Sequence, residues 1–181
     1  SFQSWAKTDD ISDFEIEGMS VGDSLLEFVT KKNVTSGYVN YYVNKKYTVT
    51  ELFPKEFKKK ITTYDMMQFQ FKINDKKMII QAMSGIISYK KNIKDCYQKL
   101  DKIYEEIASV FTSWNDLGKE TYNHKGSEAK ITDYVLENES RDEIQIACYN
   151  YHDDNKNHDH FRIALRTYEY RTWLQEEAYY Q

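Results

Sequence analysis

Residues 92–112 read NIKDCYQKLDKIYEEIASVFT, and this stretch decides the fold. Its apolar side chains recur at intervals of three and one, which is the period of an α-helix that buries one face. The apolar stripe consists of Ile93, Cys96, Tyr97, Leu100, Ile103, Tyr104, Ile107, Val110 and Phe111. Asn92 precedes the stripe and belongs to the residue types that cap helix N-termini. We therefore expect a helix over 92–112 that packs its stripe against another element.

The sequence on both sides of this helix predicts β-strands. Residues 61–73 alternate between apolar and polar side chains, and after a turn at 74–77 the chain returns as a strand over 78–89, with a bulge expected at Gly85. Further β-rich segments lie at 38–49, 118–124, 128–137, 142–151 and 160–168. Tight turns between neighbouring strands favour antiparallel pairing. The predicted fold class is α+β: an antiparallel sheet of about five to seven strands with one long helix packed on one face and short terminal helices.

The short helices are expected near both ends of the chain. Asp13–Glu17 reads as a short strand, and Ser20 then caps a predicted amphipathic helix that ends near Lys31. Residues 169–178 have a helical pattern that would dock Trp173 on the rest of the protein.

The length of 181 residues fits a single domain, and the scarcity of Pro (one) and Gly (six) argues against long linkers. We expect a flexible N-terminus over 1–10 and a single α+β domain over 11–181. Residues 61–112 and 128–178 share the order hairpin then helix, which suggests a degenerate repeat. No apolar run approaches the roughly 18 residues of a membrane helix, so we expect no transmembrane segment.

The net charge of −4 is unevenly distributed along the chain. Residues 1–30 carry −6, residues 31–99 carry +10 and residues 100–181 carry −8. The basic middle could face an anionic surface, or folding could interleave the three segments into a mixed surface. Few aromatic side chains lie between the lysines and no RNA-binding signature occurs, so we expect no nucleic-acid partner.

Cys96 and Cys148 are the two cysteines of the chain. Cys96 lies in the helix stripe, and Cys148 shares one side of the strand 142–151 with Ile144 and Ile146, so both thiols face the core. They could form a disulfide that clamps the helix to the sheet, or they could stay reduced as buried thiols. No C-x-x-C spacing occurs, so we expect no zinc site built on cysteine.

Gly22-Asp23-Ser24-Leu25 resembles the G-D-S-L block of the SGNH esterase and lipase family. The resemblance implies that Ser24 is a catalytic nucleophile served by the histidine and aspartate of a distant D-x-x-H block. No D-x-x-H occurs in the chain, and the residues before Gly22 do not form the buried apolar strand of that family. The alternative is an ordinary serine in a short capped helix.

The loop 152–160 is a candidate metal site. It holds three histidines and three aspartates in nine residues, and the candidate ligands are His152, Asp154, His158 and His160. A solvated turn between two strands would have the same polar composition. No Walker A, G-x-G-x-x-G or H-E-x-x-H motif occurs, so we expect no cofactor.

The sixteen tyrosines exceed what one core needs. Those that could line a groove for a sugar, a peptide or a protein partner are Tyr38, Tyr41, Tyr42, Tyr47, Tyr149, Tyr151, Tyr168, Tyr170, Tyr179 and Tyr180. A base-composition bias toward Lys, Asn, Ile and Tyr would explain the same enrichment.

Residues 13–26, which read DFEIEGMSVGDSLL, resemble the opening motif E-G-[IM]-S-x-G-D-S-L-L of a family of exported proteins of marine alphaproteobacteria. Residues 83–89 (MSGIISY) and 161–163 (FRI) are similar to that family too. The resemblance implies a periplasmic or secreted protein and brings no activity with it. An oxidising compartment would favour the disulfide between Cys96 and Cys148.

No convergent set of nucleophile, acid and base can be assembled from the sequence. We therefore expect a non-enzymatic exported or cell-envelope module that binds a protein, a glycan or an anionic surface. A small hydrolase using Ser24 and a metal-binding protein using the loop 152–160 are the alternatives. No feature of the sequence indicates an oligomeric state.

Overall fold

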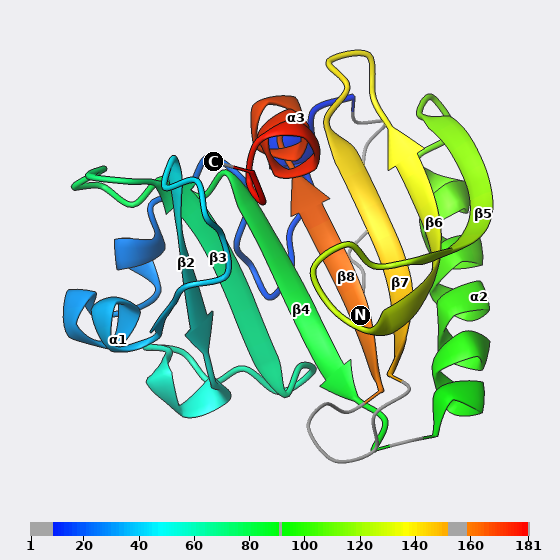
Figure 1. Ribbon diagram of the computed structural model, residues 1–181, viewed down its shortest axis with the longest axis horizontal. Coiled ribbons are helices and arrows are strands. Elements are labelled where there is room, and N and C mark those ends of the chain that lie inside the picture. Colours follow the sequence, from blue (N-terminus) through cyan, green and yellow to red (C-terminus); the bar gives the residue numbers. More distant parts are fainter. Residues whose placement is uncertain (1–8, 91, 152–158, 181) are drawn as a thin grey trace.

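The computed structural model describes residues 9–90, 92–151 and 159–180. One antiparallel sheet of eight strands dominates it, in the order β1-β2-β3-β4-β8-β7-β6-β5 (Figure 1). The strands are β1 (Tyr38–Val39), β2 (Tyr47–Leu52), β3 (Met66–Lys72), β4 (Ala82–Ser88), β5 (Asn115–Asn123), β6 (Ala129–Glu137), β7 (Glu143–Tyr151) and β8 (His160–Arg166). Two meanders, β1–β4 and β5–β8, meet where β4 pairs with β8.

The predicted α+β class with five to seven strands is wrong, because the protein is mostly one eight-stranded sheet and only 26% of the described residues are helical. The segment 38–49 explains the undercount, because this one β-rich segment contains both β1 and the start of β2. β1 is only two residues long and lies at the edge of the sheet. An edge strand buries little, so it carries a weak apolar alternation.

The two faces of the sheet differ in chemistry, because successive side chains of a strand point to opposite faces. On one side, here called the apolar face, the central strands contribute large buried side chains such as Phe69, Met83 and Phe161. The opposite side, here called the polar face, receives the side chains between them, such as Gln68 and Arg162. Each face is covered by a different part of the chain.

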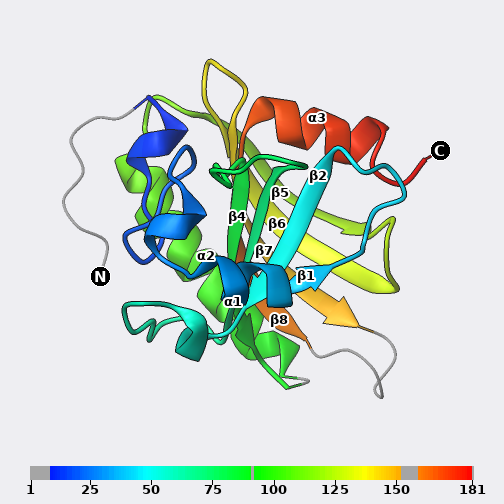
Figure 2. The same ribbon diagram turned by 90° about the vertical axis from the view of Figure 1, so that its left-hand side faces the viewer.

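Helix α2 (Ile93–Val110) covers the apolar face over β6, β7 and β8 (Figure 2). The predicted stripe is buried at Cys96, Leu100 and Ile107. Cys96 forms a disulfide with Cys148 of β7, with the two Cα atoms 6.0 Å apart. The bridge fixes the helix to the centre of one meander.

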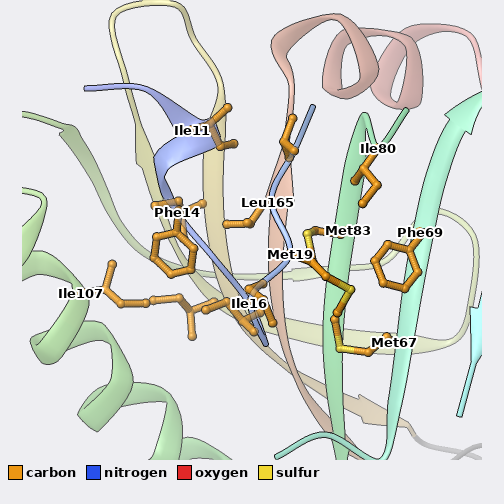
Figure 3. Close-up of a cluster of buried hydrophobic side chains, with 14 of the residues drawn as sticks. Ile11, Phe14, Ile16, Met19, Met67, Phe69, Ile80, Met83, Ile107 and Leu165 are labelled. Carbon is orange, nitrogen blue, oxygen red and sulfur yellow. The ribbon is translucent and has the colours of Figure 1, made fainter. Parts of the chain in front are cut away.

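The N-terminal segment covers the other half of the apolar face. It contains the 3-10 turns η1 (Ile11–Asp13) and η2 (Leu25–Glu27) and the helix α1 (Lys31–Ser36). Figure 3 shows its apolar side chains, such as Phe14 and Met19, in one cluster with side chains of the sheet.

The predicted strand at 13–17 and the predicted helix after Ser20 are both absent from this segment. Ser20 does not cap a helix, because its Oγ donates to the Phe14 carbonyl at 3.0 Å. The Gly22 N–H donates to the Ile80 carbonyl at 2.9 Å, which holds the backbone alongside the approach to β4. Tertiary hydrogen bonds thus replaced the helical ones that the apolar spacing predicts.

Helix α3 (Tyr168–Glu176) lies on the polar face, where Thr167 caps it by accepting from the Tyr170 N–H. Tyr170 and Trp173 pack against Tyr47 of β2 and Ala82 of β4. A third 3-10 turn, η3 (Pro54–Glu56), follows β2.

Each meander is followed by one helix, but α2 lies on the apolar face and α3 on the polar face. The degenerate repeat over 61–112 and 128–178 stays a prediction. Residues 1–8 of the predicted flexible N-terminus lie outside the described residues. No helix in the described part of the chain is both long and apolar enough to span a membrane.

Replacing both cysteines by alanine should lower the free energy of unfolding by about 3–4 kcal/mol, because a bridge with a sequence separation of 52 restricts the unfolded chain. Urea denaturation of the oxidised wild type and the double variant measures the loss. Wild type reduced with dithiothreitol is the control and should approach the variant. Equal free energies for the variant and the oxidised protein would contradict this role.

Gly85 forms no bulge; it pairs regularly within β4. Its lack of a side chain makes room for the Tyr64 ring, since an added Cβ would lie 2.5 Å from Tyr64 Cε1. Gly85→Ala should therefore lower the free energy of unfolding by about 1–3 kcal/mol. A double-mutant cycle with Tyr64→Ala should recover most of that loss in urea denaturation. An unchanged loss in the Tyr64→Ala background would exclude the ring as its cause.

Candidate ligand-binding face

The polar face carries buried hydrogen-bonding side chains at its centre. They are Gln68, Gln70, Ser84, Asp133, Glu143 and Gln145. Buried amides and carboxylates are unfavourable unless they are hydrogen-bonded, so their partners show how the face is organised. Three clusters result: an ion network beside α3, an amide–carboxylate cluster on β5–β7, and an arginine–tyrosine cluster on β7 and β8.

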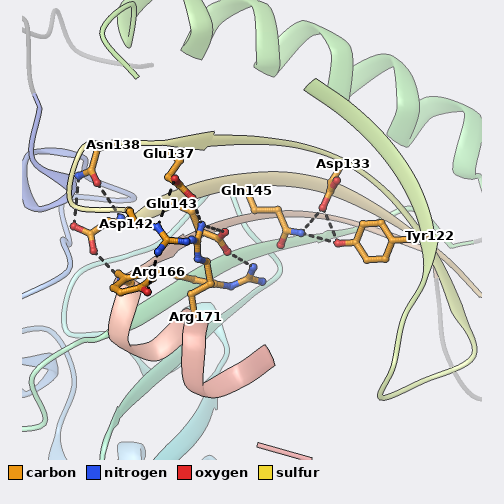
Figure 4. Close-up of polar contacts among 11 residues, drawn as sticks. Tyr122, Asp133, Glu137, Asn138, Asp142, Glu143, Gln145, Arg166 and Arg171 are labelled. Atoms are coloured by element: carbon orange, nitrogen blue, oxygen red, sulfur yellow. Dashed lines mark hydrogen bonds and ion pairs between the residues drawn. The ribbon is translucent and has the colours of Figure 1, made fainter. Parts of the chain in front are cut away.

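The ion network ties α3 to the sheet (Figure 4). Arg171 Nη1 of α3 lies 2.6 Å from Glu137 Oε2 and 3.1 Å from Glu143 Oε2. Arg166 Nη1 of β8 lies 2.7 Å from Glu143 Oε1. Two cations and two carboxylates therefore neutralise each other at this end of the face.

The second cluster joins three neighbouring strands (Figure 4). Tyr122 Oη donates to Asp133 Oδ2 at 2.8 Å, and Gln145 Nε2 donates to Tyr122 Oη at 3.2 Å. Burial raises the pKa of the Asp133 carboxyl, whereas the hydrogen bonds from Tyr122 and Gln145 lower it. The Gln145 Oε1 is buried and has no hydrogen-bond partner among the described residues.

Arg162 of β8 is the centre of the third cluster. Its guanidinium carbon lies 5.0 Å from the centroid of the Tyr149 ring, and its Nη1 donates to Gln68 Oε1 at 3.4 Å. The Nε is buried and, within the described residues, has no hydrogen-bond partner. Arg162 also forms no ion pair with any carboxylate of those residues, in contrast to Arg166 and Arg171.

The amide that accepts from Arg162 is shared. Gln70 Nε2 donates to the same Gln68 Oε1 at 2.8 Å, and Gln68 Nε2 donates to Glu51 Oε1 at 3.2 Å. The hydroxyl of Tyr41 also donates to Glu51. The acceptor of Arg162 is therefore neutral, distant and divided between two donors, which makes it a weak partner for a guanidinium.

The structure brings most of the predicted tyrosines to this face or its rim. These are Tyr41, Tyr42, Tyr47, Tyr149, Tyr151, Tyr170 and Tyr179. The Tyr149 ring stacks on His160, with centroids 4.5 Å apart and planes 13° apart. Tyr42 Oη lies 2.8 Å from Tyr170 Oη, which links the cluster to α3.

The other predicted tyrosines lie elsewhere. Tyr38 packs against Phe71 of the apolar face, Tyr168 lies beneath the guanidinium of Arg141, and Tyr180 is 57% exposed.

The phenols of Tyr42, Tyr151 and Tyr179 and the imidazole of His124 are neutral at neutral pH. Burial raises the pKa of Tyr42, of Tyr151 and, to about 12, of Tyr179, and the charge of Arg162 only partly opposes this. Burial lowers the pKa of His124, and Arg162 lowers it further. Arg162 thus supplies a positive charge within a layer of neutral hydrogen-bonding rings.

Ser24 lies far from this cluster in the fold, in the segment that covers the apolar face. Its Oγ donates to the Lys77 carbonyl at 2.6 Å, where Ser24 bridges to Ile79. His124 bonds instead to Ser127, and His160 stacks on the polar face. Neither of the two described histidines is hydrogen-bonded to Ser24, and the Ser24 hydrolase stays a prediction.

The candidate metal site falls mostly outside the described residues, which include His160 but not His152, Asp154 or His158. Within the described part of the chain, no group of three or more His, Cys, Asp or Glu side chains is placed to hold a metal ion.

Sequence reasoning did not single out Arg162, Gln68 or Gln145. Each stands between two apolar residues of a strand, as Arg162 does between Phe161 and Ile163. Such a position reads as solvent-facing when nothing is known to cover that side of the sheet.

Glu143→Gln should lower the free energy of unfolding by about 3–5 kcal/mol, because it removes the carboxylate that Arg166 and Arg171 share in a buried site. Lys119→Gln is the control, since it breaks the exposed pair with Asp101 and should cost less than about 1 kcal/mol. Urea denaturation measures both. Equally small losses would contradict a structural role for the ion network.

Comparison of the chain with protein-family models, with curated proteins and with solved structures found no match in any of the three.

Proposed function

We propose that this protein is a non-enzymatic, extracytoplasmic binding module that holds an acidic saccharide on its polar face. Arg162 binds the carboxylate of the ligand, and the surrounding tyrosines bind its rings and hydroxyls. The observation that carries the proposal is the Arg162 guanidinium, which forms no ion pair within the described residues and donates only to the neutral amide of Gln68 there.

The charge argues for an anionic ligand. Placing an unpaired cation in a partly buried site is unfavourable unless a partner compensates it. Arg166 and Arg171 on the same face have carboxylate partners, so Arg162 is the exception there. A ligand carboxylate could accept from the two Nη groups together, which is a bidentate geometry that guanidinium groups favour.

The neighbours of Arg162 argue for a saccharide. Tyrosine rings offer flat apolar surfaces with a polar tip, which suit the faces and hydroxyls of sugar rings. The amides of Gln68 and Gln70 are buried and hydrogen-bonded within the protein, so they hold Arg162 in place instead of contacting the ligand. Tyr41 at the rim is 52% exposed, so this part of the face contacts solvent.

The disulfide and the sequence resemblance support the proposed compartment. A disulfide between Cys96 and Cys148 is compatible with an extracytoplasmic protein, because oxidising compartments preserve such bonds. The opening motif resembles exported proteins, which supports a periplasmic or secreted location. Saccharides of the cell envelope and of the surrounding medium are accessible from both locations.

Isothermal titration calorimetry with trigalacturonate, and with the neutral galactose trimer as the matched probe, tests the proposal. Wild type should bind the acidic trimer and should bind the neutral one at least tenfold more weakly. Arg162→Gln should weaken trigalacturonate binding by about ten- to hundredfold, because a charge-assisted bidentate contact is lost.

Arg141→Gln is the control for net charge, since Arg141 is an exposed arginine away from this cluster and its loss should leave the affinity unchanged. Equal affinity of wild type and Arg162→Gln for trigalacturonate would contradict the proposal, as would equal affinity of wild type for the two trimers.

A further inference from the structure

A pocket of about 730 Å³ lies on the opposite side of the sheet from Arg162. The N-terminal segment, residues 59–64 and helix α2 surround it, and strands β4 and β8 form its floor. Its volume falls within the range of small-molecule sites in proteins. None of the polar-face residues around Arg162 lines it.

The pocket has apolar side chains in its floor and on part of its walls. Ile16, Phe161 and Ile163 are buried, and each exposes at most 3% of its surface. Tyr64, Ile87 and Ile103 are only half-buried. A hydrocarbon chain lying on these three half-buried side chains would remove apolar surface from water on both sides of the contact.

Six charged side chains line the same pocket: Lys59, Lys99, Lys102, Glu15, Glu17 and Glu106. Lys99 lies deepest among the cations, because it is half-buried with its Nζ 5.7 Å from the centroid of the Phe161 ring. The other two lysines are exposed. None of the three forms an ion pair with a carboxylate of the described residues.

The carboxylates are arranged differently from the lysines. Glu17 is half-buried, and its Oε1 already accepts from the Thr63 N–H at 3.1 Å. Glu15 and Glu106 are exposed. The ammonium group of Lys99 is therefore the charged group nearest to the apolar floor of the pocket.

We infer that this pocket binds an anionic amphiphile, with its alkyl chain on Tyr64, Ile87 and Ile103 and its carboxylate on Lys99. An alkyl carboxylate satisfies both features of the pocket at once, since the half-buried apolar side chains take the chain and the unpaired ammonium takes the head group. Lys102, one helical turn further along α2, adds a second cation near the same head group.

Three probes with alkyl chains of nine or ten carbons test the inference: decanoate, decyltrimethylammonium and decyl maltoside, each titrated calorimetrically below its micelle concentration. Wild type should bind decanoate saturably and should bind the cationic and neutral probes at least tenfold more weakly. Lys99→Met keeps the side-chain length and removes the charge, so it should weaken decanoate binding by about tenfold. Glu106→Gln should strengthen it, because a repelling charge is removed.

Lys94→Met is the control, because Lys94 is an exposed lysine of α2 that does not line the pocket. Its affinity for decanoate should match that of wild type. Circular dichroism of each variant verifies that the fold is retained.

Equal binding of the three probes, unchanged binding by Lys99→Met, or no saturable binding of decanoate would overturn the inference. Binding to phosphatidylglycerol vesicles without binding of free decanoate would also overturn it, because the lysines would then meet a membrane surface. Arg162→Gln should bind decanoate with the same affinity as wild type. The saccharide site and the amphiphile pocket are therefore tested independently.

Discussion

The antiparallel pairing of β4 with β8 is the constraint on which the rest of the structure depends. It joins the two four-stranded meanders in a register that sets Gly85 opposite Ile163 and Ile86 opposite Arg162. Because side chains alternate along each strand, this single register determines which side chains lie on each face of the sheet.

On the polar face, the register places Arg162 beside Gln68 of the other meander. Phe161 comes beside Ile87 in the floor of the pocket on the apolar face. Both candidate sites therefore lie across the seam between the meanders, and a shift of one residue would abolish both.

Different interactions attach the covering segments to the two faces of the sheet. On the apolar face, α2 and the N-terminal segment bury large side chains, and the Cys96–Cys148 bridge fixes one of these covers covalently. On the polar face, α3 is attached through Tyr170 and Trp173 and through the charges that Arg171 shares with β6 and β7. Charges that are paired in this way contribute to structure and leave little for a ligand. Arg162 differs from Arg166 and Arg171, because its acceptor is an amide that it shares with another donor. This difference makes Arg162 a candidate ligand-binding residue, whereas the other two arginines are structural.

Much of the fold could be predicted where a segment has a strong period. The stripe of α2, the inward side of β7 and the location of both cysteines on core-facing positions all follow from alternation alone. The number of strands does not, because the one β-rich segment 38–49 contains both the two-residue edge strand β1 and the start of β2. The helix expected after Ser20 does not form for another reason. The backbone of this segment is hydrogen-bonded to residues near β4, and no local sequence pattern encodes that long-range contact. The tyrosines were found from their abundance, whereas Arg162 and Gln68 were missed, because only the position of α3 and its neighbours reveals that polar residues on that side are buried.

Nitrogen-resolved NMR of the arginine side chains tests the central claim most directly, because it observes the Arg162 Nε–H itself. A proton that is buried over the Tyr149 ring should exchange slowly with water, show nuclear Overhauser contacts to that ring, and shift when an acidic saccharide is added. An Nε–H of Arg162 that exchanges as fast as that of the exposed Arg141, and that has no contact with Tyr149, would contradict both the register of the β4–β8 seam and the site assigned to it.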